Sequence, residues 1–300
     1  MDLKGNEKVK KLLSAEFRER RMAGSYLFSG PRGVGKKLFA LWFARLIQCS
    51  SPKGDEPCGE CHSCKAIMRG TDPDVVLIEP LADEGKRLVV PTLKIETIRE
   101  NLIRKSSLKS WQGRWKIFII DEAHTLTEDA GNLLLKTLEE PPEKVLIILV
   151  THLSSKLLPT VRSRLRRVEF ETINWDAAKE FYLSSGWTPE ELERYAPYFD
   201  GTVAWLDELK DLGLDEMDTW IVQLEESRRG KEWRIFFDII EKITRLEKKR
   251  IYVFFKYFIR KKEEELLASD REYELEKIWT IAQLLYRQRD PGQLLQRIYL

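Results

Sequence analysis

The sequence predicts an α/β module with a parallel sheet covered by helices on both faces, followed by an all-helical region. Runs of consecutive apolar residues at 26–28, 117–120 and 145–150 indicate buried strands, and segments with helical spacing of apolar residues separate them. Strands buried on both faces read as continuous apolar runs, and their alternation with helices predicts a parallel sheet. After residue 170 no strand pattern follows, which predicts helices for the remainder.

The elements of the α/β module follow in a simple order. They are a basic amphipathic helix (1–22), a strand (26–29), an apolar helix (38–47), a strand (75–78), a helix (95–103), a strand (116–121), a helix from about 128 to the Pro141-Pro142 pair, and a strand (145–150). Proline cannot continue a helix, so the pair marks a sharp end.

The helical region divides into two parts. Residues 171–208 predict short helices, with breaks at Gly186, Pro189, Pro197 and Gly201. From residue 209 the pattern predicts long amphipathic helices with apolar stripes: Trp233, Phe236, Phe237, Ile240 and Ile243, then Leu275, Ile278, Trp279, Ala282 and Leu285. Such stripes indicate core packing. We therefore expect three domains: 1–170 with a cysteine-rich insert at 49–64, 171–208, and 209–300.

Composition restricts the class of protein. Hydrophobic residues make up 43%, which supports a sizeable core and argues against a disordered chain. Lys and Arg number 51 against 49 Asp and Glu, so net charge does not indicate a nucleic-acid binder. The first residues lack a signal-peptide pattern. The longest apolar run, 251–259, is far shorter than the ~20 residues that span a bilayer. We expect a cytoplasmic protein with reduced thiols and no membrane contact.

A phosphate-loop motif follows the first strand. It comprises Gly30, Pro31, Arg32, Gly33, Val34, Gly35, Lys36 and Lys37. Its glycines let backbone N–H groups turn toward phosphates, and Lys36 reaches the β- and γ-phosphates. The motif normally ends in Ser or Thr, whose hydroxyl binds Mg²⁺. A lysine cannot, and repels a cation 4 Å away by about 4 kcal/mol per unit charge pair. Either Lys37 points away, or the metal is not held normally. ATP binding stays open, and efficient hydrolysis is not expected.

An acidic pair, Asp121 and Glu122, ends the strand at 116–121. In phosphate-loop ATPases an aspartate here orders the Mg²⁺ hydration shell and a glutamate polarises the attacking water. The alternative is a strand-end turn capped by Asp121. The phosphate loop upstream favours the catalytic interpretation.

The four cysteines of the chain form one cluster. They are Cys49, Cys58, Cys61 and Cys64. Four thiolates within 16 residues of a cytoplasmic protein predict a tetrahedral structural zinc site, with no open position for catalysis. Disulfides are the alternative. His62 lies within the cluster, and we expect it to face solvent.

These motifs, in this order, resemble bacterial clamp-loader subunits of the AAA+ class. The most specific match is the run Leu134–Pro142, L-L-K-T-L-E-E-P-P, followed by 158–164, L-P-T-V-R-S-R. In the family the second run carries an arginine finger, here Arg164; the next residue is Leu165 where the family has Cys. The resemblance implies an AAA+ P-loop module, a helical lid and a helical collar, with a zinc insert after the loop helix. The alternative for Arg164 is an internal salt bridge, with Glu169 near.

Within this family the chain resembles the delta-prime type more than the gamma/tau type. Gamma/tau subunits have Ser or Thr where this chain has Lys37, and a lid arginine where it has Ala204. Lys36, Asp121 and Glu122 are retained. The length also fits delta-prime, because tau carries a long C-terminal extension. Little or no ATPase activity is then implied for the chain alone.

The resemblance also implies partners and a role. Five such subunits form a ring through their collars, and with ATP they load a sliding clamp onto primed DNA. A delta-prime subunit presents its finger to the ATP site of a gamma/tau neighbour, in a complex that also holds a delta subunit. Sensor 1 falls at Thr151 or His152, and Arg99 matches a DNA-tracking position, although a solvated arginine explains it equally. An active ATPase, either gamma/tau or a helicase loader, and a structural zinc module that binds no nucleotide remain as alternatives.

Overall fold

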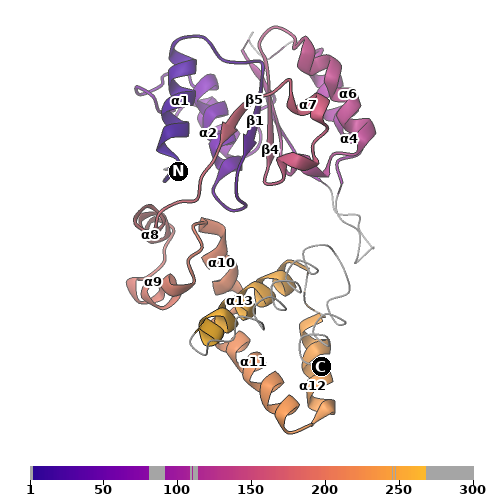
Figure 1. Ribbon diagram of the computed structural model, residues 1–300. Helices are drawn as coiled ribbons and strands as arrows, with labels where there is room; N and C mark the ends of the chain where they lie inside the picture. Colours follow the sequence, from indigo (N-terminus) through magenta and orange to yellow (C-terminus); the bar gives the residue numbers. More distant parts are fainter. Residues whose placement is uncertain are drawn as a thin grey trace. The chain divides into compact units, whose positions relative to one another are not determined.

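Five parallel strands form the sheet of the N-terminal part, in the order β2-β3-β4-β1-β5. Figure 1 labels β4, β1 and β5 of this sheet. They are β1 (Ser25–Ser29), β2 (Val75–Ile78), β3 (Lys116–Ile120), β4 (Val145–Thr151) and β5 (Arg166–Glu169). The computed structural model describes residues 3–80, 92–108, 110, 114–244, 246 and 248–267. The predicted fold class is confirmed, and β5 is a strand that the sequence analysis did not predict.

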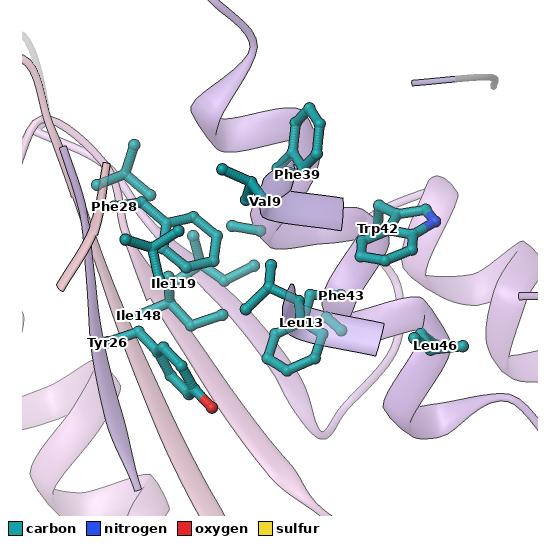
Figure 2. Packing of buried hydrophobic residues seen from close by; sticks show 14 of the residues in the cluster. Val9, Leu13, Tyr26, Phe28, Phe39, Trp42, Phe43, Leu46, Ile119 and Ile148 are labelled. Carbon is teal, nitrogen blue, oxygen red and sulfur yellow. The ribbon is translucent and has the colours of Figure 1, made fainter. Parts of the chain in front are cut away.

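Helices cover both faces of this sheet because alternate strand residues point in opposite directions. On one face Tyr26 and Phe28 of β1 form a buried cluster with residues of α1 (Glu7–Arg18) and α2 (Lys36–Gln48), among them Leu13 and Phe43 (Figure 2). On the other face Leu27 packs in a second buried cluster with Leu134 of α6 (Glu128–Glu139). This double coverage explains the continuous apolar runs in the sequence.

The remaining elements of this part connect or cap the sheet. They are α3 (His62–Met68), α4 (Ile95–Ile98) continuing through a π-helical turn (Arg99–Ile103) into α5 (Arg104–Ser106), 3₁₀ turns (Ala123–Thr125 and Ser154–Lys156), α7 (Pro159–Arg162) and α8 (Trp175–Ser184). The predicted helix 95–103 is thus three residues longer and contains one π turn.

Contacts divide the chain into two units, Met1–Gly186 with Gly201–Val203, and Trp187–Asp200 with Ala204–Leu300. The described helices of the second unit are α9 (Pro189–Tyr195), α10 (Val203–Leu212), α11 (Leu214–Arg229), α12 (Trp233–Thr244) and α13 (Lys248–Leu267), with a 3₁₀ turn at Ala196–Tyr198. The first residue of α10, Val203, still belongs to the first unit. The three-domain division stays a prediction. Its boundary after residue 208 falls inside α10.

Aromatic side chains pack the second unit. Trp205 is buried, with the Lys256 ammonium 3.9 Å from its ring centre, and Tyr257 donates a hydrogen bond to Asp218 (2.6 Å).

Among the described helices none is long and apolar enough to cross a membrane.

Only part of the apolar stripe predicted for α12 is buried in the core. Phe236 and Ile243 are fully buried, whereas Trp233 and Phe237 are 39% and 43% exposed. Trp233 and Phe237 lie four residues apart and share a face that the buried pair does not. The second predicted stripe, 275–285, lies outside the described residues.

Candidate phosphate-binding and zinc sites

The phosphate loop connects β1 to the N-terminus of α2, as its motif requires. Gly30 directly follows β1 with φ 142°, and a Cβ on it would lie 2.2 Å from the carbonyl oxygen of Phe170. Gly35 precedes the helix with φ 87°, which disfavours any side chain. The loop's N–H groups and the positive end of α2 can therefore face an anion. No acidic residue occupies the first turn of α2.

Lys36, the first residue of α2, is nearly buried and turns back onto its own loop. Its ammonium donates hydrogen bonds to the carbonyl oxygens of Gly30 (2.8 Å) and Pro31 (2.5 Å). Burial lowers the pKa of Lys36 to about 8, although the charges of Glu122 and Asp121 oppose the shift. The predicted phosphate-binding cation is thus in place within the loop.

Lys37 does not point away from the site. Its ammonium pairs with Glu79, just after β2, and lies 3.5 Å from Oδ2 of Asp121. Burial opposes its charge, but the hydrogen bond to Glu79 and the Asp121 carboxylate outweigh it and raise the pKa of Lys37. Lys37 is therefore a cation at neutral pH, in contact with the predicted metal-ordering carboxylate.

These residues do not fit the Mg²⁺ that such a loop normally holds. The hydroxyl ligand is missing at position 37, and Asp121 already faces an ammonium group. A divalent ion 4 Å from that ammonium would meet about 8 kcal/mol of repulsion at an effective dielectric constant of 20. The geometry therefore favours the second alternative of the sequence analysis, in which a metal is not held in the usual way.

Glu122 has an unusual backbone and two imidazole neighbours. Its φ of 49° and ψ of 40° are left-handed, a strained conformation for glutamate. Its Oε2 lies 3.5 Å from Nε2 of His124 and 3.5 Å from Nδ1 of His152. Burial, then the charge of Asp121, raise the pKa of Glu122. The carboxylate therefore faces His124 and His152 at the edge of the phosphate loop.

Both imidazoles are neutral at pH 7. Burial lowers the pKa of His124 to about 4, assisted by the charge of Lys156, and burial also lowers that of His152 to about 4. Thr151, at the end of β4, lies 3.3 Å from Nδ1 of His124 through its hydroxyl. Both sensor 1 candidates, Thr151 and His152, thus lie beside the acidic pair. The Glu122, His124 and His152 donor atoms are all within 4.8 Å of one another, close enough to hold a metal ion.

The four cysteine sulfurs converge as predicted. All lie within 4.8 Å of one another, and none forms a disulfide. Cys49 follows the last residue of α2, Cys61 is the N-cap of α3, and Cys64 lies buried in that helix. His62 is exposed and takes no part in the cluster. The arrangement suits a tetrahedral zinc ion with four thiolate ligands.

Backbone donors prepare these sulfurs for a metal. The N–H groups of Cys58, Cys61 and Cys64 donate to the sulfurs of Cys49 (3.3 Å), Cys58 (3.3 Å) and Cys61 (3.5 Å) respectively. Burial opposes ionisation of Cys61, but N–H donors from Cys64 and Ser50 outweigh it and lower the pKa of this thiol to about 6. Burial raises the pKa of Cys64 to about 12.

The insert is fastened to the module through Glu56. Its carboxylate accepts a hydrogen bond from the Trp42 indole (2.9 Å) and pairs with Lys10 (2.5 Å). The insert that carries the cysteine cluster is therefore held against α1 and α2.

Arg164 forms an internal ion pair, although not with Glu169. Its guanidinium lies 2.5 Å from the carboxylate of Glu139, at the end of α6, and donates to the Thr160 carbonyl (2.8 Å). Its side chain is 35% exposed. Arg166 pairs instead with Glu16, which is nearly buried.

Two other predicted positions, Arg99 and Ala204, follow the phosphate loop in the sequence. Arg99 is exposed and opens the π turn, and its contact with DNA stays a prediction. Ala204 follows Val203, whose N–H donates to the Gly33 carbonyl (3.0 Å). The lid segment 201–203 thus contacts the loop through its backbone.

The sequence analysis missed several neighbours of the site. These neighbours are Glu79, His124 and Glu139, and only Glu79 and Glu139 are far in sequence from the residues that they pair with. His124 could have been predicted from the sequence as a neighbour of the acidic pair, because it lies two residues after Glu122. Nothing local marks Glu79 or Glu139.

Comparisons with known proteins agree with these motifs. The profile of the family described as "DNA polymerase III, delta subunit" matches residues 5–174. The DNA polymerase III tau subunit of Bacillus subtilis is 38% identical over 176 residues, 59% of this chain and 30% of that protein. The delta' subunit of the same organism is 29% identical over 232 residues, 77% of this chain and 68% of that protein.

A second delta' subunit and a solved structure are also similar to this chain. The delta' subunit of Pseudomonas aeruginosa is 33% identical over 142 residues, 47% of this chain and 41% of that protein. A solved gamma-subunit-related protein from Thermotoga maritima has a TM-score of 0.49 and 17% identity, covering 98% of this chain and 96% of its own. The chain spans less than a third of the tau subunit that it matches.

Proposed function

Because the chain belongs to the DNA polymerase III delta-subunit family, we propose that it works as a delta-prime-type subunit of a bacterial clamp loader. It acts beside gamma/tau and delta subunits in loading a sliding clamp onto primer-template DNA. The observation that carries this assignment is the pairing of Lys37 with Asp121 in an otherwise complete phosphate loop. The loop is built to hold phosphates, and its metal-dependent hydrolysis is disabled.

In this role the chain supplies Arg164 to the ATP site of a neighbouring gamma/tau subunit. A positive charge beside the transferred phosphoryl group raises the rate by ~10³–10⁵ in other arginine-finger systems. Partly exposed ion pairs contribute at most about 1 kcal/mol. The Glu139 pair therefore holds Arg164 in the free chain without preventing its release to a neighbour.

The zinc ion, when bound by the four thiolates, supplies rigidity to the insert. The chain's own residues position it through Glu56, as described above. Exposed Trp233 and Phe237 on α12 supply apolar surface in the predicted collar, and this supports assembly with other subunits.

The finger is tested in a complex reconstituted with gamma/tau and delta subunits. Arg164→Ala is expected to slow ATP turnover at the neighbouring site by ~10³ and to reduce clamp loading. Assembly is expected to remain intact. Arg167→Ala is the matched control, because Arg167 is exposed in the same strand region, whereas Arg166 neutralises the nearly buried Glu16. If the complex with Arg164→Ala loads clamps at the wild-type rate, Arg164 is not the arginine finger.

An active gamma/tau-type ATPase is the second candidate, favoured by the 38% identity to a tau subunit. The two candidates separate on the isolated chain. The delta-prime assignment expects negligible steady-state turnover, because Lys37 and Ala204 replace residues that gamma/tau subunits use. Turnover of ~1–100 s⁻¹, the range of efficient phosphoryl transfer, would establish the gamma/tau type instead.

A further inference from the structure

We propose that Lys37 takes the place of magnesium, so that this phosphate loop binds a nucleoside polyphosphate as the metal-free anion. The proposal rests on the phosphate-binding role of the loop proposed above, and not on which subunit type the chain represents. Its ligand class is a nucleoside di- or triphosphate without a divalent ion. Lys37 is then a residue that determines the form of ligand bound.

The position of the ammonium group is the first argument. Lys37 is the second residue of α2, where the usual Ser or Thr holds a metal between its hydroxyl and the phosphates. Its Nζ lies 3.5 Å from Asp121 and also contacts Glu79. The chain therefore supplies one positive charge at the place where the metal-ordering carboxylate would otherwise need one.

The balance of charge around the loop is the second argument. Lys36 and Lys37 are adjacent at the positive end of a helix, and no acidic residue lies in its first turn. Asp121, Glu122 and Glu79 are the carboxylates that face them. Arg32 adds a third positive charge, so three cations face three carboxylates. These side-chain charges balance without a divalent ion, whereas Mg²⁺ would add two positive charges beside Lys37.

The side chain's reach is the third argument. The Lys37 side chain is 36% exposed and has four methylene groups, so its ammonium can rotate from Glu79 toward a ligand while it stays near Asp121. Lys36 is buried and bonded to two loop carbonyls. Lys37 is thus the more mobile of the two adjacent cations, and it can adapt to the phosphates.

Titration of the full-length chain with a fluorescent ATP analogue tests the proposal. One buffer contains excess Mg²⁺, and the other is freed of divalent ions with a chelating resin and matched in ionic strength. Zinc content is measured in both, so that loss of the cysteine site is detected. Wild-type Kd is expected to agree within about threefold between the buffers, where tenfold corresponds to ~1.4 kcal/mol.

Two substitutions of Lys37 separate the effect of its positive charge on binding from the effect of its side-chain shape. Lys37→Thr restores a hydroxyl, and is expected to bind at least about tenfold more tightly with Mg²⁺ than without it. Lys37→Met keeps the length but has neither charge nor hydroxyl, and is expected to lose about tenfold in both buffers. Lys11→Thr, at an exposed position of α1, is the control for removal of one lysine charge.

Several results would overturn the proposal. These are wild-type binding that strengthens tenfold with Mg²⁺, wild-type chain that binds no analogue in either buffer, and Lys37→Met that binds like wild type. Circular dichroism melting confirms that each variant is folded before its Kd is compared. None of these results bears on assembly with gamma/tau and delta, which tests the subunit assignment separately.

Discussion

Raising the pH from 7.5 to 9 is expected to weaken nucleotide binding to the isolated chain about eightfold. Burial places the pKa of Lys36 at about 8 in the free protein. Beside anionic phosphates the ammonium form is favoured, so the bound chain keeps its proton. The charged fraction of free Lys36 falls from about three quarters at pH 7.5 to about a tenth at pH 9, and the ratio gives the expected change in Kd.

The sign follows from which state holds the proton. Above pH 8 the free chain has released the Lys36 proton, and nucleotide binding must take one up, so affinity falls as pH rises. The terminal phosphate, with a pKa near 6, is already ionised over this window. Lys37 stays charged because its pKa is raised. The change in affinity therefore reports Lys36.

Calorimetric titration in two buffers of different ionisation enthalpy measures the proton uptake directly. We expect close to one proton per nucleotide at pH 9 and about a quarter at pH 7.5. Lys36→Arg is the control, because a guanidinium stays charged over this range, and its pH profile is expected to be flat. An unchanged wild-type Kd, or an equal pH dependence in Lys36→Arg, would show that the reasoning is wrong.

Other predictions concern the zinc insert and the core. Wild-type protein purified without added zinc is expected to contain about one zinc per chain. The Cys64→Ser variant is expected to contain almost no zinc and to melt at a lower temperature. A wild-type protein that is free of metal and linked by disulfides would contradict this prediction. Phe43→Ala removes a fully buried ring between α2 and the sheet, and is expected to lower the free energy of unfolding by ~3–5 kcal/mol in denaturant titration. Leu183→Ala, at a 43% exposed position, is the control, with a change within about 0.5 kcal/mol.

The interior strands could be predicted from sequence because burial on both faces leaves a local signal. The runs 117–120 and 145–150 are fully buried in β3 and β4. The edge strand β2 was predicted with its observed bounds because all four of its residues are apolar, although only Ile78 is fully buried. Strand β5 left no such signal. It is four residues long, lies at the edge of the sheet, and buries only Val168 among its residues. An edge strand with Arg166, Arg167 and Glu169 exposed resembles a polar loop in sequence.

Within the candidate sites, too, only the local contacts could be predicted from the sequence. The phosphate loop and the cysteine cluster lie within short stretches of chain, so spacing alone predicted which residues converge. The ion-pair partners could not be predicted this way. Lys37 meets Glu79, the residue after β2, and Arg164 meets Glu139 from α6 rather than Glu169. Both pairings depend on strand order and helix length, which no local pattern encodes.

The site separates two properties that usually occur together. A phosphate cradle needs loop N–H groups, a helix N-terminus and one lysine, and these are all present around Gly30, Gly35 and Lys36. Hydrolysis needs in addition carboxylates that are available to a metal and a water molecule. Here Asp121 faces Lys37, and Glu122 faces two neutral imidazoles. The first property can therefore persist without the second. The role proposed above, in which the chain binds nucleotide without turning it over, requires this separation.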